Sequence, residues 1–173
     1  MKEEYKFLKD GRAYYFSKEK DICGVKPYSI EPDTLSMQEL INISDDLMEI
    51  TKERKALGVA GIQVGVPYKI AVVRVSSFID RDMFITVMNP VYYPMGSKTK
   101  NIEGCLTIPD QLFEVKRYKS VKSKFVTFNK DRSELVSVEM KFKGMDAFVY
   151  QHETDHCNGI LCSQKGSFYR RYK

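Results

Sequence analysis

The stretch His152-Glu153-Thr154-Asp155-His156 contains both histidines of this 173-residue chain. Residues four apart lie on one face of an α-helix, so both imidazoles can reach a single metal ion while Glu153 stands beside it. A catalytic site of this type usually has three protein ligands and one open position. The stretch therefore predicts a helix that carries a hydrolytic metal site, and a third ligand has to come from elsewhere.

The residues around this stretch predict a buried helix from Met145 to Cys157. Three apolar residues at 147–149 lie one turn before His152 and should form an apolar wall at the helix N-terminal end. The helix should stop at Asn158-Gly159, because these two residue types best tolerate the left-handed conformation after a helix.

A second helix is predicted from about 36 to 55. Ser36 and Glu39 have the spacing of a capping box, and apolar residues then recur near the helical period at Met37, Leu40, Ile41, Leu47 and Met48. The next segment, residues 57–67, contains three glycines and a proline. These residues exclude a regular helix, so we expect a loop that makes close backbone contacts.

Short β-branched and aromatic runs follow, and they predict strands of an antiparallel or mixed sheet. The runs are Ile70–Val75, Phe84–Met88, Leu112–Val115, Val121–Phe128 and Leu135–Phe142. Residues 129–132 between the last two runs are typical of a hairpin loop. A helix, then strands, then a helix indicates an α+β fold in which sheets pack around a central helix with the HExxH pattern.

Composition predicts one soluble globular domain over residues 1–173, with 43% hydrophobic and 29% charged residues. No apolar run is long enough to span a bilayer, and the first residues lack the apolar core of a secretory signal. We therefore expect a cytoplasmic monomer without membrane contact, whose four cysteines are thiols. The net charge of +5 is modest and is explained by a solvated exterior.

Two cysteines compete for the place of the third ligand. Cys162 follows His156 with a glycine between them, which is where a metzincin protease has its third histidine. Cys105 lies 47 residues before His152, in the segment Glu103-Gly104-Cys105-Leu106-Thr107. Spacing alone leaves both candidates open.

Three segments together resemble the signature motifs of peptide deformylases, in the order and approximate spacing of that family. They are Gly58-Val59-Ala60-Gly61-Ile62-Gln63, Glu103-Gly104-Cys105-Leu106-Thr107 and Gln151-His152-Glu153-Thr154-Asp155-His156. The resemblance implies that Cys105, His152 and His156 bind one divalent metal ion. This ion is usually Fe²⁺ in the family, and Zn²⁺, Ni²⁺ or Co²⁺ can substitute. Cys162 is then a bystander.

The resemblance also implies an activity: removal of the N-formyl group from formyl-methionine on newly made polypeptides, through attack by metal-bound water or hydroxide. Glu153 would be the general acid and base, and the Gln63 side chain and Leu106 backbone N–H would stabilise the oxyanion. Glu103 resembles a carboxylate that pairs with Arg117 to brace the cysteine segment. Other positions match the substrate-binding residues: Leu57, Gly58, Glu103, Gly104, Met145, Phe148 and Val149.

The sequence departs from the family pattern in two notable places. Leu112 stands where the family usually has an arginine that faces the substrate. Only 17 residues follow His156, so we expect no long C-terminal helix of the kind that bacterial members use to dock on the ribosome. The tail that ends at residues 170–173 should be solvated and frayed, although its basic residues could support a transient ribosome contact.

Two other functions remain open from the residues alone. One is a metzincin-like zinc endopeptidase that uses Cys162. The other is a non-catalytic module that docks on RNA and whose metal, held by four protein ligands, only stabilises the fold.

Overall fold

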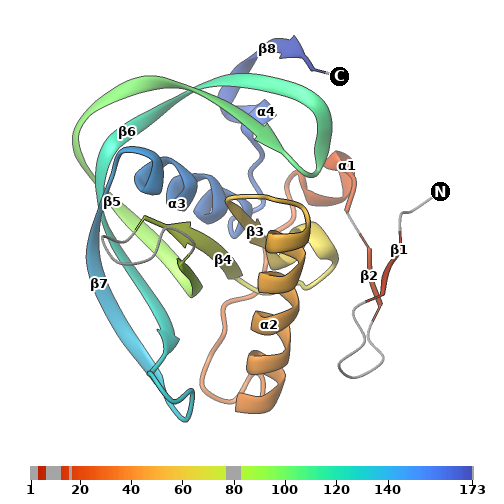
Figure 1. Ribbon diagram of the computed structural model, residues 1–173, viewed down its shortest axis with the longest axis vertical. Coiled ribbons are helices and arrows are strands. Elements are labelled where there is room, and N and C mark those ends of the chain that lie inside the picture. The colour runs from red at the N-terminus through yellow and green to blue at the C-terminus, as the bar shows by residue number, and fades with distance from the viewer. Residues whose placement is uncertain (1–3, 7–12, 16, 77–82, 173) are drawn as a thin grey trace.

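Two long antiparallel strands form the frame of the computed structural model (Figure 1). Strand β5 spans Met83–Cys105 and β6 spans Ile108–Phe128, so only Leu106 and Thr107 connect them. Register shifts next to Met88, Met95 and Gly104 interrupt the ladder between the two strands, and such irregularities bend a strand pair. The pair curves accordingly (Figure 1), and its tight turn brings Cys105 to the very end of β5.

The structure describes residues 4–6, 13–15, 17–76 and 83–172. Within these ranges, the other strands are β1 (Glu4–Lys6), β2 (Ala13–Tyr15), β3 (Gly58–Ala60), β4 (Ile70–Val75), β7 (Leu135–Lys143) and β8 (Gly166–Arg171). The helices are α1 (Glu19–Ile22), α2 (Met37–Glu53), the 3₁₀ helix η1 (Gly61–Val64), α3 (Gly144–His156) and α4 (Cys162–Lys165). Strands β3 to β7 form one antiparallel sheet in chain order, β8 pairs with β6, and β1 pairs with β2.

Strand β4 is buried on both faces over residues 70–73, which explains the apolar sequence of this part of the strand. Side chains alternate along a strand, so Ile70 and Val72 join the core beneath α2, whereas Ala71 and Val73 join the core that contains residues of α3. Helices α2 and α3 both contact β3 and β4. The sheet therefore lies between the two helices, and the α+β class with antiparallel strands is confirmed.

Helix α2 confirms the predicted capping box. The Ser36 hydroxyl accepts a hydrogen bond from the Glu39 backbone N–H, and the Glu39 carboxylate accepts one from the Ser36 N–H. The helix ends at Glu53, and the next three residues, 54–56, line the cavity of the candidate site.

Helix α3 also lies where the sequence predicted a helix, and polar side chains fix its position against the long strands. The Tyr150 hydroxyl bonds to the backbone oxygens of Val91 and Lys124. The Gln151 amide bonds to both the N–H and the C=O of Tyr118 on β6. These bonds hold the helix that carries both histidines in register with β5 and β6.

The end of α3 is a Schellman motif. Gly159 has φ +71, its N–H bonds to the His156 oxygen, and the Ile160 N–H bonds to the Asp155 oxygen. The predicted stop at Asn158-Gly159 is therefore confirmed.

Three parts of the sequence interpretation need correction. Residues 57–67, expected as a loop, contain strand β3 and helix η1, because Gly58–Ala60 pairs with β4. The runs 112–115 and 121–128 are one strand, since residues 116–120 between them pair with residues 95–100 of β5. The tail does not fray: residues 166–171 form β8, which pairs with residues 111–115 of β6.

No helix in the described part of the chain is long and apolar enough to cross a membrane.

Gly159 should tolerate no side chain. A Cβ at this position would lie 1.7 Å from the Val25 backbone oxygen, whereas a Cβ at Gly96, which also has positive φ, would meet nothing within 4 Å. We expect Gly96→Ala to lower the free energy of unfolding by about 1–2 kcal/mol, the cost of the left-handed conformation. Gly159→Ala should cost more than about 3 kcal/mol or prevent folding. Urea denaturation measures the free energy of unfolding of both variants. Equal losses would contradict the conclusion that a side chain at Gly159 clashes with the Val25 backbone.

Candidate active site

Three metal-binding side chains meet where the turn after β5 packs against the end of α3. The Cys105 Sγ lies 3.4 Å from His156 Nε2, which lies 2.9 Å from His152 Nε2. Together they form a group whose ligand atoms all lie within 4.8 Å of one another. The helical spacing of the histidines and the β5–β6 turn thus bring together the three residues that the sequence predicted as ligands.

Hydrogen bonds set the orientation of both imidazole rings. His152 Nδ1 lies 2.9 Å from Glu103 Oε2, and His156 Nδ1 lies 3.0 Å from the Ile160 backbone oxygen. A carboxylate and a carbonyl only accept hydrogen bonds, so each Nδ1 carries the proton and each Nε2 presents its lone pair. Two nitrogen lone pairs and one sulfur therefore converge, and this arrangement is stable only with a positive charge among them.

The electrostatics of the cysteines support the same ligand set. The hydrogen bond with Cys162, together with the nearby imidazoles, outweighs burial and holds the pKa of Cys105 well below its usual value. The same bond and burial raise the pKa of Cys162. The lowered pKa favours the thiolate of Cys105, which is the form that binds metals, and Cys162 lies outside the group of three.

The other two cysteines lie away from this chemistry. Cys157 is fully buried, and burial raises the pKa of its thiol. Cys23 is partly buried and packs against the apolar core.

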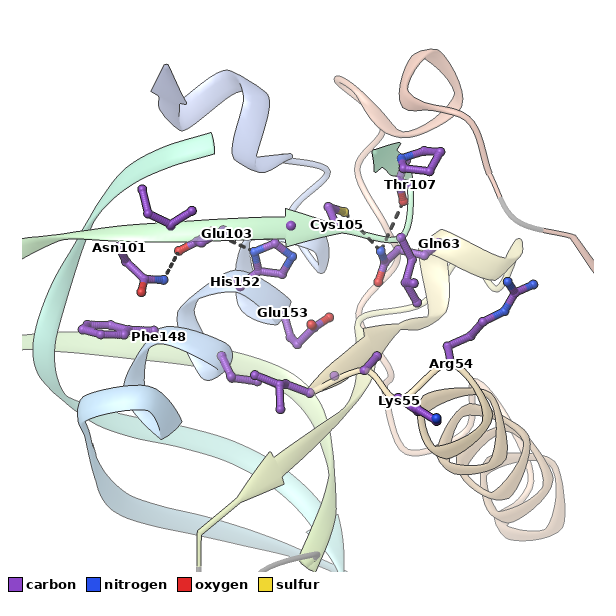
Figure 2. Close-up of a pocket in the computed structure, with 18 of the residues that line it drawn as sticks. Arg54, Lys55, Gln63, Asn101, Glu103, Cys105, Thr107, Phe148, His152 and Glu153 are labelled. Carbon is purple, nitrogen blue, oxygen red and sulfur yellow. Dashed lines mark hydrogen bonds and ion pairs between the residues drawn. The ribbon is translucent and has the colours of Figure 1, made fainter. Parts of the chain in front are cut away.

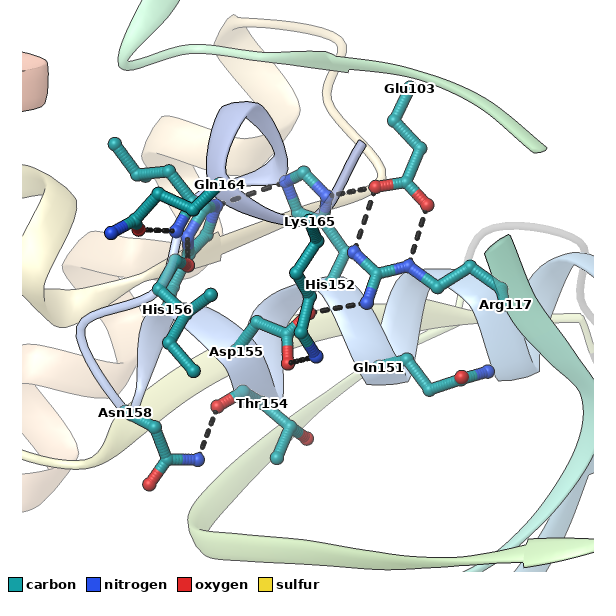
Figure 3. A network of polar contacts seen from close by, with 12 residues as sticks. Glu103, Arg117, Gln151, His152, Thr154, Asp155, His156, Asn158, Gln164 and Lys165 are labelled. Atoms are coloured by element: carbon teal, nitrogen blue, oxygen red, sulfur yellow. Dashed lines mark hydrogen bonds and ion pairs between the residues drawn. The ribbon is translucent and has the colours of Figure 1, made fainter. Parts of the chain in front are cut away.

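A network of buried charges surrounds His152 (Figure 3). Arg117 donates to both carboxylate oxygens of Glu103, at 2.7 and 2.8 Å, and also to Asp155. Lys165 donates to the other oxygen of Asp155 at 2.6 Å. Burial opposes ionisation of Glu103, but the bonds from Arg117 and His152 prevail and hold its pKa far below the usual range. The predicted pairing of Glu103 with Arg117 is therefore confirmed, and Glu103 acts on His152 as a charged acceptor.

Glu153 stands beside the three ligands without a full set of partners. Its side chain is buried, and Oε2 has no hydrogen-bond partner among the described residues. Burial raises the pKa of this carboxyl group. Gly58 makes room for it, since a Cβ at Gly58 would lie 2.6 Å from Glu153 Oε1. The carboxyl group and β3 thus pack against each other (Figure 2).

Helix η1 brings Gln63 to the other side of Cys105 (Figure 2). The Ala60 N–H donates to Gln63 Oε1 at 2.9 Å, which fixes the orientation of the amide. Its Nε2 then donates toward Cys105 Sγ at 3.5 Å and Thr107 Oγ1 at 3.2 Å. Gln63 is therefore a fixed donor beside the candidate ligands.

A cavity of about 630 Å³ opens in front of these residues. Its lining includes every predicted site residue except His156, which is fully buried behind it: Leu57, Gly58, Gln63, Glu103, Gly104, Cys105, Leu106, Met145, Phe148, Val149, His152 and Glu153. The sequence interpretation missed other lining residues, among them Arg54, Lys55, Asn101 and Tyr172. Arg54 and Lys55 directly follow helix α2. The predicted end of this helix, near residue 55, was therefore the sequence feature that could have pointed to them.

The donor set fits a divalent metal ion. Two imidazoles and a thiolate are ligands of borderline to soft character, suited to iron, zinc, nickel and cobalt. The carboxyl group of Glu153 also lines the cavity, and its Oε2 has no hydrogen-bond partner among the described residues. A three-ligand site with an acid-base group at an open cavity defines a metal-dependent hydrolase.

Comparison with known proteins identifies the family. The family model for polypeptide deformylase matches residues 26–171. Peptide deformylase from Nautilia profundicola is 34% identical over 139 residues, which cover 79% of this chain and 77% of that protein. Peptide deformylase from Campylobacter jejuni is also 34% identical over 139 residues, which cover 78% of this chain and 77% of that protein.

Solved structures agree with the sequence match. The actinonin-bound class I type b peptide deformylase from Acinetobacter baumannii superposes with a TM-score of 0.74 at 28% identity and covers 88% of this chain and 97% of that one. A probable peptide deformylase from Synechococcus phage S-SSM7 has a TM-score of 0.74 at 30% identity. This match covers 87% of this chain and 97% of the phage protein. The chain therefore belongs to the peptide deformylase family, whose enzymes are metal-dependent hydrolases of formylated peptides.

Substitution of the two competing cysteines should separate their roles. We expect Cys105→Ala to lose bound metal, because it removes the thiolate, and Cys162→Ala to retain most of it. Metal content per protein, measured after purification under anaerobic conditions with added iron, gives the answer. Cys23→Ala serves as the control for loss of a thiol. Retained metal in the Cys105 variant and lost metal in the Cys162 variant would favour the metzincin-like alternative.

Removal of Arg117 should destabilise the protein strongly. Arg117→Met leaves Glu103 and Asp155 buried without their main partner, which costs about 3–5 kcal/mol when a buried ion pair is broken. Lys165→Met removes a partly exposed partner of Asp155 and should cost less than about 1 kcal/mol. Chemical denaturation of both variants checks the contrast. Similar stability losses would show that the buried network does not centre on Arg117.

Proposed function

We propose that this chain removes the N-formyl group from formyl-methionine at the start of newly made polypeptides. The observation that carries the proposal is the convergence of Cys105, His152 and His156 beside the carboxyl group of Glu153, at the wall of a cavity. We further propose a single catalytic domain over residues 1–173 that acts as a cytoplasmic monomer. In this domain α3 is the central element of the fold.

Cys105, His152 and His156 would hold one divalent ion, with Fe²⁺ as our choice and Zn²⁺, Ni²⁺ or Co²⁺ as substitutes. Such an ion, when bound, acts as a Lewis acid that polarises a carbonyl oxygen and acidifies water. The geometry supports Cys105 over Cys162 as the third ligand, since only Cys105 belongs to the group of three ligand atoms.

Glu153 would move the proton during hydrolysis. Its carboxylate can take a proton from the attacking water at Oε2, which has no other partner among the described residues, and can return it to the leaving amine. A base works best when its pKa lies near the working pH. Burial shifts the pKa of Glu153 upward, in that direction.

Two donors would stabilise the negative charge that develops on the formyl oxygen. One is the Gln63 Nε2–H group, held by the bond from the Ala60 N–H to the other end of the amide. The second is the backbone N–H of Leu106, in the two-residue turn that follows Cys105. Fixed donors of this kind are each worth on the order of 10²–10³ in rate.

The cavity walls would select methionine and align the peptide. Apolar side chains of Leu57, Met145, Phe148 and Val149 line the cavity and suit a thioether side chain. Two strand edges can bond to an extended backbone, because β3 pairs only with β4 and residues 101–104 of β5 pair only with β6 among the described strands. These edges include Gly58 and Gly104.

Glu103 lines the cavity, but both of its oxygens bond to neighbouring side chains. We therefore propose that Glu103 braces the site and does not bind substrate through its carboxylate.

Peptide binding in this cleft has a precedent among the similar structures. One is a class I type b peptide deformylase from Acinetobacter baumannii with bound Met-Ala-Ser, at a TM-score of 0.74 and 27% identity. We propose that formyl-methionyl nascent peptides and their products occupy the same cleft here. Any ribosome contact would be transient and would use the basic residues of the C-terminal strand.

The activity should depend on Glu153 but metal binding should not. Iron-loaded protein under anaerobic conditions should release formate from formyl-Met-Ala-Ser. Glu153→Gln should keep its metal and lower kcat/KM by about 10²–10⁴-fold, the contribution of a general acid and base. Glu139→Gln, an exposed residue on β7, is the matched control and should behave as wild type. The absence of formate above a metal-only control would refute the proposed function.

A further inference from the structure

The C-terminal strand brings one side chain to the active-site cavity. Strand β8 pairs with residues 111–115 of β6, and the Tyr172 N–H then donates to the Asp110 backbone oxygen at 3.1 Å. This bond fixes the backbone of Tyr172 beyond the end of the strand. Its side chain lines the cavity that contains Cys105, His152 and Glu153.

The hydroxyl of Tyr172 lies above the residue that precedes the cysteine ligand. A Cβ built on Gly104 would lie 3.5 Å from the Tyr172 Oη, and the only other atom near that Cβ belongs to Leu112. Leu112 offers no hydrogen-bonding group. Tyr172 therefore supplies the polar side-chain atom next to Gly104 on β5.

This hydroxyl is available for a ligand. Tyr172 is 43% exposed, and its hydroxyl has no hydrogen bond to another group in the described part of the chain. A tyrosine hydroxyl normally finds a partner when it is covered. A peptide in the cavity would cover it and could supply that partner.

The position of the hydroxyl along β5 indicates which part of the peptide it meets. The formyl group has to lie at the metal ligands, that is, at Cys105. An extended peptide advances about 3.3 Å per residue, so its second residue passes Gly104 rather than Cys105. Backbone carbonyl groups are present in every peptide sequence, whereas the second side chain differs from one nascent protein to the next.

We propose that Tyr172 is a substrate-binding residue whose hydroxyl donates a hydrogen bond to the backbone carbonyl of the second residue of the formylated peptide. Tyr172, directly after strand β8, thereby becomes part of the wall of the substrate cleft. The contact is independent of side-chain identity and favours peptides over free formyl-methionine. This inference rests on the proposed function, because it requires a formylated peptide in the cleft.

The test compares a long and a short substrate in the iron-loaded enzyme. Tyr172→Phe keeps the ring and removes only the hydroxyl. A net hydrogen bond predicts a three- to tenfold rise in KM for formyl-Met-Ala-Ser, with kcat unchanged because the bond is equal in ground and transition states. N-formylmethionine, which lacks a second residue, should show the same kcat/KM for variant and wild type. Calorimetry should show the same three- to tenfold weakening for the product peptide Met-Ala-Ser.

Tyr169→Phe is the matched control. Tyr169 lies on strand β8, three residues before Tyr172, and is 51% exposed, but it does not line the cavity. It should match wild type on both substrates, and both variants should keep the wild-type melting temperature.

Two results would overturn the inference on an active wild-type enzyme: unchanged KM and Met-Ala-Ser affinity in Tyr172→Phe, or an equal loss on N-formylmethionine and formyl-Met-Ala-Ser. A wild-type enzyme that releases formate from neither substrate contradicts the proposed function instead.

Discussion

The arrangement of the site depends on the guanidinium group of Arg117. It comes from β6, binds Glu103 on β5 in a two-pronged pair, and binds Asp155 on α3. Glu103 in turn holds the ring of His152. One buried cation thus connects the strand that ends in the cysteine with the helix that carries the histidines. A planar guanidinium can serve three carboxylate oxygens at fixed angles, which a lysine cannot do.

Such a network contributes more to geometry than to net stability. Burial of ions costs much of what their attraction returns, so an apolar cluster would stabilise this region at least as well. The charges have a different effect here, because ionised Glu103 sets the tautomer of His152 and makes its Nε2 a better electron-pair donor. The convergence of donor atoms on a single point therefore follows from a salt bridge that lies outside the group of ligands.

Close backbone approach is the second constraint on the site. Gly58 leaves room for the carboxyl group of Glu153, and Gly159 lets the chain turn so that the Ile160 oxygen meets His156 Nδ1. The helical spacing of the histidines and the capped end of α3 could be predicted, because they are local properties of the sequence. The position of Cys105 beside the two histidines could not be predicted from spacing, since it depends on the long-range pairing of residues 88–105 of β5 with residues 108–126 of β6.

The contrast between local sequence properties and long-range pairing also explains why the sequence interpretation missed the C-terminal strand. Residues 166–171 contain aromatic residues, but they lack a clear alternation of apolar and polar residues, and their charges resemble those of a solvated tail. They form a strand because β6 offers a free edge at residues 111–115, in the part of its length that β7 does not cover. A strand that forms only against an available edge leaves little local signal. None of Cys105, His152 and His156 lies on this strand, so the strand affects the site only through the residue that follows it, Tyr172, which lines the cavity.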